Sequence, residues 1–207
     1  MIVSGTPEWF AARAARLTAS QFGAALGLHP HCSRQKLWRI KTGLETVESN
    51  FHMQRGIDNE SNAISAYEMA TGLLVSTAGL VLHPEHDWLA ATPDGFVGRS
   101  GLLETKCPAA LRPDPPAYHV AQCLGQMECT GREWCDYAQW CEGKVTVHRI
   151  ARSPAFWAWA LPRLREFWAC VVDLREPPRA RKADVSEVPG LMAGVNESNG
   201  DIKCANY

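Results

Sequence analysis

Apolar and polar residues follow two different periods along this chain, and the longest helical pattern covers residues 51–71. Apolar side chains recur there at steps of three and four, and Gly72 ends the segment. The inward stripe of this helix reads Ile57, Glu60, Ile64 and Tyr67. Because an unpaired buried charge is costly, we expect the carboxylate of Glu60 either to turn outward or to meet a cation.

Shorter helices are expected on both sides of this long one. Helix propensity, capping residues and closing glycines predict them at about residues 8–16, 18–27, 34–42, 117–130 and 153–174. Apolar, β-branched runs punctuated by glycine predict strands at residues 73–84, 87–98, 101–108, 134–142 and 145–150. The last two strands read as a hairpin that turns at Gly143 and Lys144.

The order of these elements indicates the fold class. Helices, then a small mixed β-sheet, then more helices predict a single α/β domain over residues 1–175. Residues 176–207 are poor in large apolar side chains and rich in Pro, Gly, Asn and Asp. We therefore expect a loosely attached C-terminal tail.

Composition limits the classes of function. Lysine and arginine number 21 against 22 aspartates and glutamates, which gives a formal net charge of −1. This balance excludes a strongly basic protein that coats nucleic acid through bulk charge, but it permits a local basic groove. No apolar run approaches the roughly 18 residues of a membrane span. The N-terminal sequence lacks the basic and apolar regions of a secretory signal, so we expect a cytoplasmic protein.

Cysteine is frequent, with eight residues, yet no Cys-x-x-Cys spacing occurs. Four cysteines recur every six residues from Cys123 to Cys141, a step that places no two neighbours on one helical face. We expect reduced cysteines that serve as small buried apolar residues, in preference to disulfides or a metal site. The pair His83 and His86 lacks further ligands at a spacing suited to zinc.

Residues able to carry chemistry gather around Asp94 and Glu104. Glu104 and Lys106 are two apart on a predicted strand, so their side chains leave the same face. Glycines between Asp94 and Glu104 allow a hairpin that brings the two carboxylates together. With the carbonyl oxygen of Thr105 they offer ligands suited to Mg²⁺ or Mn²⁺. Lys106 could orient a water and stabilise a pentacovalent phosphate, as in metal-assisted phosphodiester hydrolysis.

A second Glu-x-Lys occurs at residues 142–144, so this spacing alone does not identify a metal site. Its nearest acidic neighbour, Asp136, lies six residues back on one strand. That separation is about 20 Å at roughly 3.3 Å per residue, so one metal ion cannot contact both. The alternative for Glu104 and Lys106 is an ion pair on a solvent-facing sheet. Apolar residues on both sides of the pair favour a buried face instead.

Pro93-Asp94 and Glu104-Thr105-Lys106 resemble the core motif of the PD-(D/E)xK nucleases, which have a restriction-endonuclease-like α/β fold. Flanking motifs narrow the resemblance to the lambda exonuclease or YqaJ-type family of phage alkaline exonucleases. These motifs are Trp9 with Arg13 and residues 17–20, Arg55-Gly56 with Glu60 and Tyr67, residues 91–95, residues 103–108, and Ala121-Gln122 before Met127 and Gly131. Together they cover about residues 9–132.

This resemblance implies a metal site. Asp94, Glu104 and the carbonyl oxygen of Thr105 would hold catalytic Mg²⁺, for which Mn²⁺ could substitute. Glu60 would lie near a second metal ion, which implies a two-metal site. Lys106 would act on the nucleophilic water.

The resemblance also implies residues that bind water and DNA. Gln122 would steady the nucleophilic water. The terminal 5′-phosphate and the DNA strand would be bound by Arg13, Ser20, Thr92 and Arg112. Simpler alternatives remain, because Arg13 can pair with Glu8, Ser20 can cap a helix, and Gln122 can be an ordinary buried hydrogen-bonding residue.

The function implied is that of a Mg²⁺-dependent 5′→3′ exonuclease, which digests one strand of linear double-stranded DNA. It would leave 3′ single-stranded tails for phage homologous recombination by single-strand annealing. The partners implied are linear duplex DNA, a phage single-strand annealing protein and further copies of the chain in a homotrimeric ring, in the cytoplasm of a bacterial host. Two alternatives stay open: another PD-(D/E)xK endonuclease, and a catalytically inactive DNA-end-binding module. The intact Asp94, Glu104 and Lys106 argue against the second.

Overall fold

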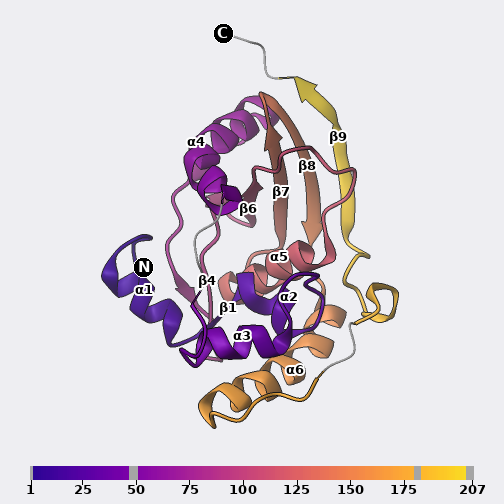
Figure 1. Ribbon diagram of the computed structural model, residues 1–207. Helices are drawn as coiled ribbons and strands as arrows, with labels where there is room; N and C mark the ends of the chain where they lie inside the picture. The colour runs from indigo at the N-terminus through magenta and orange to yellow at the C-terminus, as the bar shows by residue number, and fades with distance from the viewer. Residues whose placement is uncertain (1, 47–50, 180–182, 204–207) are drawn as a thin grey trace.

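The computed structural model describes residues 2–46, 51–179 and 183–203, with the backbone alone at 51–53 and 197–203 (Figure 1). Its helices are α1 (Pro7–Ala14), α2 (Phe22–Ala25), α3 (Arg34–Lys41), α4 (Phe51–Thr71), α5 (Ala117–Thr130) and α6 (Pro154–Val172), with 3-10 turns η1 (Ala19–Gln21) and η2 (Val185–Glu187). Its strands are β1 (Leu17–Thr18), β2 (Val75–Ser76), β3 (Val81–Leu82), β4 (Leu89–Ala91), β5 (Gly95–Val97), β6 (Gly101–Lys106), β7 (Trp134–Cys141), β8 (Lys144–Ala151) and β9 (Val195–Lys203). The mixed α/β architecture confirms the predicted fold class.

The central sheet has six strands in the order β2-β5-β6-β7-β8-β9. Strands β6 and β7 are parallel and are joined through α5, whereas the other neighbours are antiparallel. A smaller sheet has the order β1-β4-β3, and its strand β4 is followed directly by the connection to β5 of the central sheet. The predicted hairpin forms between β7 and β8, and its turn residues Glu142 and Gly143 have φ values of 50° and 78°.

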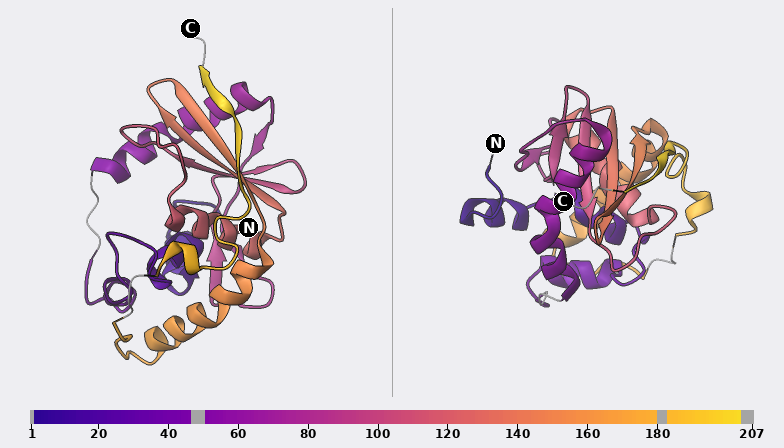
Figure 2. Two further views of the ribbon diagram at one scale, coloured as in Figure 1. Left: turned by 90° about the vertical axis from the view of Figure 1, so that its right-hand side faces the viewer. Right: turned by 90° about the horizontal axis from the view of Figure 1, so that it is seen from above.

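Two apolar clusters cover opposite faces of the sheet. Leu103 of β6 packs with Tyr67 of α4, whereas the adjacent Leu102 belongs to the cluster that contains α5 and α6. Successive residues of a strand point to opposite faces, so α4 and α5 cover different sides. Figure 2 shows α4 and α6 at opposite ends of the molecule. Glu104 follows Leu102 in this alternation and therefore faces α5.

Helix α2 packs against α5 at glycines. A Cβ atom on Gly23 would lie 2.5 Å from the Cβ of Tyr118, and one on Gly125 would lie 2.5 Å from the ring of Phe22. Only glycine permits this approach without displacing a neighbour. The contact brings η1, with Ser20, beside α5, the helix that faces Glu104 of β6.

The inward stripe predicted for α4 is partly wrong. Tyr67 is buried and Ile64 is partly buried, but Ile57 is 67% exposed and Glu60 is exposed. The reason is that the apolar contacts of α4 with the sheet come from its second half, where Ala66 and Tyr67 pack with Leu103. In the first half, Ile57 and Glu60 border a cavity.

The prediction of a loosely attached tail is wrong for the part that the structure describes. Val188 and Leu191 are buried in the main core, and β9 pairs with β8 along the sheet edge. A few apolar side chains are enough to anchor a segment when its backbone also completes a sheet edge. The described residues after 175 therefore pack with the same core and sheet as the residues before it.

The cysteines behave as the sequence predicts over the described residues. Five of them are buried: Cys123, Cys129, Cys135, Cys141 and Cys170. Cys32 and Cys107 are partly buried, and Cys204 lies outside the described residues. None of the helices in the described part of the chain combines the length and hydrophobicity needed for a membrane span.

Candidate active site

The β5–β6 hairpin brings Asp94 and Glu104 together, as the sequence predicts. Gly95 pairs with Leu103, and the backbone N–H of Asp94 donates to the Leu103 carbonyl oxygen at 3.1 Å. Asp94 Oδ2 then accepts two hydrogen bonds from Thr105, one from the backbone N–H at 2.6 Å and one from Oγ1 at 2.7 Å. Thr105 therefore holds the orientation of the Asp94 carboxylate, a role that the sequence did not indicate.

Glu104 is 1% exposed and is held through both carboxylate oxygens. Its Oε1 accepts a hydrogen bond from Lys106 Nζ and another from Gln122 Nε2 at 2.6 Å. Its Oε2 accepts from Gln126 Nε2, also at 2.6 Å. Gln126 was missed at the sequence level, although it lies one helical turn after Gln122 and so shares its face. Gln122 is thus a buried hydrogen-bonding residue whose partner is a catalytic candidate.

The pKa values of Asp94 and Lys106 show that this centre is more than a simple ion pair between one carboxylate and one lysine. Burial, followed by repulsion from Glu104, raises the pKa of Asp94 to about 7. Burial alone would lower the pKa of Lys106, but Glu104 and Asp94 together outweigh it and raise that pKa above its ordinary value. One lysine thus leaves excess negative charge between two close carboxylates. That charge, with the Thr105 carbonyl nearby, fits the donor set of a hard divalent cation.

Glu60 approaches this centre from α4. It lines both cavities beside Asp94, and burial followed by repulsion from Glu104 raises its pKa. Among the described residues, no group of three or more His, Cys, Asp or Glu side chains is arranged to share one metal ion. Glu60 therefore borders the site of Asp94 and Glu104 without joining them in a three-carboxylate cluster. Its side chain is exposed, which is the first of the two outcomes expected from the sequence, namely that it turns outward.

A cavity of about 380 Å³ joins the carboxylates to α1 and η1. Arg13 Nη1 donates to Thr92 Oγ1 at 3.3 Å, and Trp9 Nε1 donates to the same oxygen at 3.2 Å. The Arg13 guanidinium also lies 4.4 Å from the centre of the Trp9 ring. Burial lowers the pKa of Arg13, and the negative charge of Glu104 acts in the opposite direction without cancelling it, while the direct hydrogen-bond partner is the neutral Thr92 hydroxyl. A partly desolvated guanidinium whose direct contacts, Thr92 and Trp9, are neutral suits an incoming anion.

The simpler alternatives for Arg13 and Ser20 do not hold. Arg13 bonds to Thr92, 79 residues away, instead of forming the surface pair with Glu8. Thr18 occupies the N-cap position of η1, and its backbone N–H donates to Gln21 Oε1 at 3.2 Å. Ser20 is exposed, lines the smaller cavity and shares a 3.1 Å hydrogen bond with the Thr18 hydroxyl.

Lys41 closes the C-terminal end of α1 and was also missed at the sequence level. Its Nζ donates to the carbonyl oxygens of Arg13 at 3.0 Å, of Ala14 at 3.2 Å and of Arg16. Burial, followed by repulsion from Arg13, lowers the pKa of Lys41 to about 8. No sequence motif links α3 to α1, so only the tertiary structure reveals this contact.

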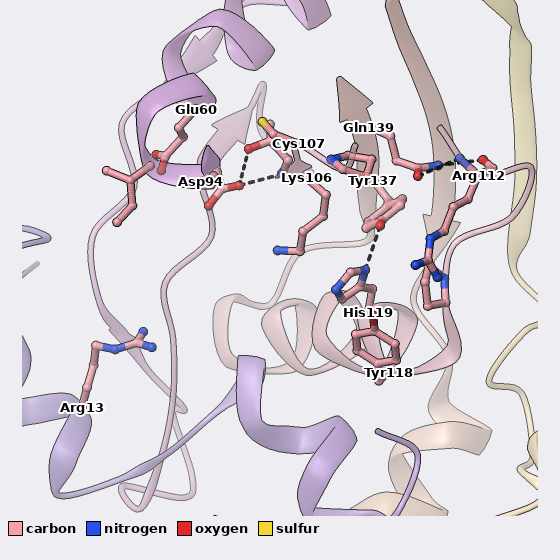
Figure 3. A pocket seen from close by; sticks show the side chains of 15 residues that line it. Arg13, Glu60, Asp94, Lys106, Cys107, Arg112, Tyr118, His119, Tyr137 and Gln139 are labelled. Carbon is pink, nitrogen blue, oxygen red and sulfur yellow. Dashed lines mark hydrogen bonds between the residues drawn. The ribbon is translucent and has the colours of Figure 1, made fainter. Parts of the chain in front are cut away.

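A larger cavity of about 590 Å³ opens on the other side of Asp94 (Figure 3). Arg112 lines it, and its backbone is held by Gln139, which accepts from the Arg112 N–H at 3.2 Å and donates to its carbonyl at 2.9 Å. His119 Nδ1 and the Tyr137 hydroxyl lie 2.8 Å apart in the wall. Arg13 and Arg112 thus lie at opposite sides of the view, with Asp94 and Lys106 between them.

The second Glu-x-Lys has no comparable surroundings. Glu142 lies in the β7–β8 turn, while Lys144 begins β8. Asp136 accepts hydrogen bonds from the Tyr67 hydroxyl at 2.7 Å and from the Arg149 guanidinium at 2.9 Å. It is therefore a structural ion-pair partner.

A family model described as the YqaJ-like viral recombinase domain matches residues 8–133, more than half of the chain. The chain belongs to this family. That match begins in α1 and runs to the start of β7, so it includes Arg13, Asp94, Glu104, Lys106 and Gln122.

Solved structures agree with membership of the YqaJ-like family. The alkaline exonuclease LHK-Exo from Laribacter hongkongensis is 33% identical, with a TM-score of 0.72 over 82% of this chain and 94% of that one. The LHK-Exo complex with dAMP gives 31% identity and a TM-score of 0.70 over the same shares. A phage related exonuclease from Haemophilus somnus 129PT shares the fold at 13% identity and a TM-score of 0.57, over 75% of this chain and 91% of that one. None of the curated proteins matches the chain.

Together, the family and the LHK-Exo match make this YqaJ-like chain a nuclease of the PD-(D/E)xK fold. The family resemblance stated from the motifs is confirmed.

Proposed function

We propose that this protein is a Mg²⁺-dependent 5′→3′ exonuclease, which removes nucleotides from one strand of linear double-stranded DNA. The observation that carries this proposal is that Arg13, Ser20 and Thr92 line the same cavity as Asp94. An anion-binding pocket beside a pair of carboxylates suits an enzyme that holds a terminal phosphate while it cuts the next phosphodiester. The LHK-Exo complex with dAMP, a deoxyribonucleotide, supports a DNA substrate.

The carboxylates and the lysine divide the work. Mg²⁺ held by Asp94, Glu104 and the Thr105 carbonyl would lower the pKa of a bound water and neutralise phosphoryl charge. Thr105 holds Asp94 in orientation, while Gln122 and Gln126 hold Glu104. Lys106 would orient the attacking water and stabilise the charge that develops on the scissile phosphate. Glu60, at the edge of the site, suits a second metal ion.

The chemistry is consistent with repeated cutting from a 5′ end. The water oxygen would bond to phosphorus while the P–O3′ bond breaks, and the 3′ oxygen would leave as a hydroxyl after gaining a proton. The released nucleotide keeps its own 5′-phosphate, and the shortened strand begins with a new 5′-phosphate. That phosphate is the group that Arg13, Ser20 and Thr92 would bind in the next cycle.

The description of the family as a viral recombinase domain supports a wider role in recombination. A 5′→3′ exonuclease leaves 3′ single-stranded tails, and we propose that a phage single-strand annealing protein uses them in recombination. We further propose that the protein acts as a homotrimeric ring around the DNA. Arg112, on the far side of the larger cavity from Arg13, would contact the strand further from its end.

The test compares linear and covalently closed circular duplexes, labelled internally, with Mg²⁺ and with EDTA. With Mg²⁺, and not with EDTA, we expect linear DNA to release mononucleotides and leave single-stranded DNA, and we expect circular DNA to stay intact. Cleavage of the circle would favour the rival endonuclease. Binding to DNA ends without any cleavage would favour the inactive end-binding module.

A further inference from the structure

Asp94 lies where two cavities meet. Arg13, Glu60 and Asp94 line both of them. The smaller contains the hydroxyls of Ser20 and Thr92, whereas the larger extends past Lys106 towards Arg112 (Figure 3). Both volumes, about 380 and 590 Å³, fall within the range of roughly 300–1,000 Å³ that small-molecule sites occupy. Because the two cavities share Arg13, Glu60 and Asp94, a strand whose end fills the smaller cavity can continue into the larger one.

The wall of the larger cavity between Lys106 and Arg112 is aromatic and uncharged. Tyr118, His119 and Tyr137 contribute their rings. Burial, followed by the charge of Lys106, lowers the pKa of His119 to about 2, so its imidazole is neutral at working pH. Burial raises the pKa of Tyr137. A neutral aromatic wall suits a nucleobase, while the cations on either side suit phosphates.

Tyr118 is built into this wall. Gly23 of α2 packs so closely on Tyr118 that an added Cβ would lie 3.0 Å from the Tyr118 Cα. The Tyr118 ring lies 4.2 Å from the His119 ring and 4.4 Å from the His29 ring, measured between centroids. Its position is thus set by the α2–α5 contact and by neighbouring rings, which is the preorganisation that a stacking surface requires.

We infer that the larger cavity binds the second nucleotide of the digested strand, on the 3′ side of the scissile phosphate, and that Tyr118 is part of the surface on which its base stacks. This inference rests on the proposed function, because the order of nucleotides follows from a 5′-phosphate bound near Arg13. It adds a base-binding subsite that does not depend on base identity, since every base has a stacking face.

The kinetic test removes the second base. The substrate is a 5′-phosphorylated duplex with an abasic residue at position 2, and the release of nucleotide 1 is measured. Two control duplexes carry the abasic residue at position 1 or at position 10 instead. For the wild-type protein we expect the position-2 duplex to show a KM about tenfold higher, as expected from the loss of one base–aromatic stack. Tyr118→Ala should raise KM similarly on the intact duplex and remove most of the extra penalty at position 2. Tyr118→Phe, which keeps the ring, should behave like the wild-type protein.

A binding test without turnover supplies an independent readout. The duplex carries 2-aminopurine at position 2, and its fluorescence is measured with Ca²⁺ in place of Mg²⁺. Stacking should quench the signal with the wild-type and Tyr118→Phe proteins and much less with Tyr118→Ala. Tyr118→Leu preserves bulk without the ring and serves if the alanine variant fails to fold.

The outcomes separate the two proposals. Wild-type protein that digests linear DNA yet shows no position-2 penalty overturns the subsite and leaves the exonuclease intact. An undiminished penalty or quench in both the alanine and leucine variants also overturns it. Failure of the wild-type protein to cut linear DNA counts against the proposed function, and the fluorescence signal then decides the subsite alone.

Discussion

Lys41 of α3 donates a hydrogen bond of 3.0 Å to the carbonyl oxygen of Arg13, the residue that points its guanidinium at Thr92. The last carbonyls of a helix lack intrahelical partners and carry partial negative charge, so an ammonium group there stabilises the helix end. Lys41 thereby holds the segment that presents Arg13 to the site.

Loss of Lys41 should loosen this segment. Lys41→Ala removes hydrogen bonds to three carbonyls, and because such bonds to charged groups are worth roughly 1.5–3 kcal/mol each but are not additive, we expect about 2 kcal/mol of lost stability. The preference for 5′-phosphate over 5′-hydroxyl ends should decrease, because KM for the phosphorylated duplex should rise. Lys41→Arg should restore part of this preference. Lys36→Ala, on the same helix and in a surface pair with Glu45, is the control. A wild-type phosphate preference in Lys41→Ala would limit Lys41 to stability.

Arg13 should determine the recognition of the 5′ end. If Arg13 binds the terminal phosphate as proposed, Arg13→Ala should abolish any preference for 5′-phosphorylated duplexes, because a guanidinium that can form two parallel hydrogen bonds to a phosphate is removed. Divalent-metal affinity should stay unchanged, since Arg13 supplies no metal ligand. Arg16→Ala is a matched control at the same helix end, where Arg16 donates to the backbone of Asp87 and Ala12. If the wild-type protein treats both kinds of end alike, the assignment of this pocket is wrong.

Lys106 should act on the rate and not on DNA binding. Lys106→Ala should lower turnover by about 10²–10³-fold, the usual effect of removing one electrostatic stabiliser of a transition state. DNA affinity measured with Ca²⁺ should change little. Lys144→Ala removes the lysine of the second Glu-x-Lys and should leave turnover unchanged. Wild-type turnover in Lys106→Ala would exclude Lys106 from the mechanism.

Asp94 should make the metal-free protein sensitive to pH. Its pKa is about 7 in the folded protein against 3.8 ordinarily, so the folded state binds the proton more tightly than the unfolded state. This contribution to stability is complete below pH 3.8 and is lost as pH rises through about 7. In EDTA, Tm of the wild-type protein should therefore fall between pH 5 and pH 8 relative to Asp94→Asn, in which that titration is absent. Mg²⁺ should restore Tm at pH 8 in the wild-type protein only, and equal curves with and without Mg²⁺ would contradict an Asp94 metal site.

The local sequence pattern was enough to predict the strand and the hairpin that carry the site residues. The spacing of Glu104 and Lys106 predicted a shared face, and glycines predicted the hairpin that returns to Asp94; the structure has both. These predictions succeeded because strand alternation and turn residues act over a few positions. The motifs around Asp94, Glu104 and Gln122 similarly pointed to the family.

Contacts between distant segments were beyond that reach. The sequence did not indicate that Gln126 holds the second oxygen of Glu104, that Lys41 closes α1, or that Tyr118 faces the larger cavity. It also misjudged Ile57, because helical periodicity gives a face but not the length of sheet available to cover it. Val188 and Leu191 were likewise overlooked, since a segment with few apolar residues becomes ordered only when a core and a free sheet edge already exist. Sequence thus determined which groups could do chemistry and on which faces of their strands they lie. Tertiary structure decided which partners hold them, because burial and hydrogen bonding between α5, α1 and β6 depend on packing across the whole chain.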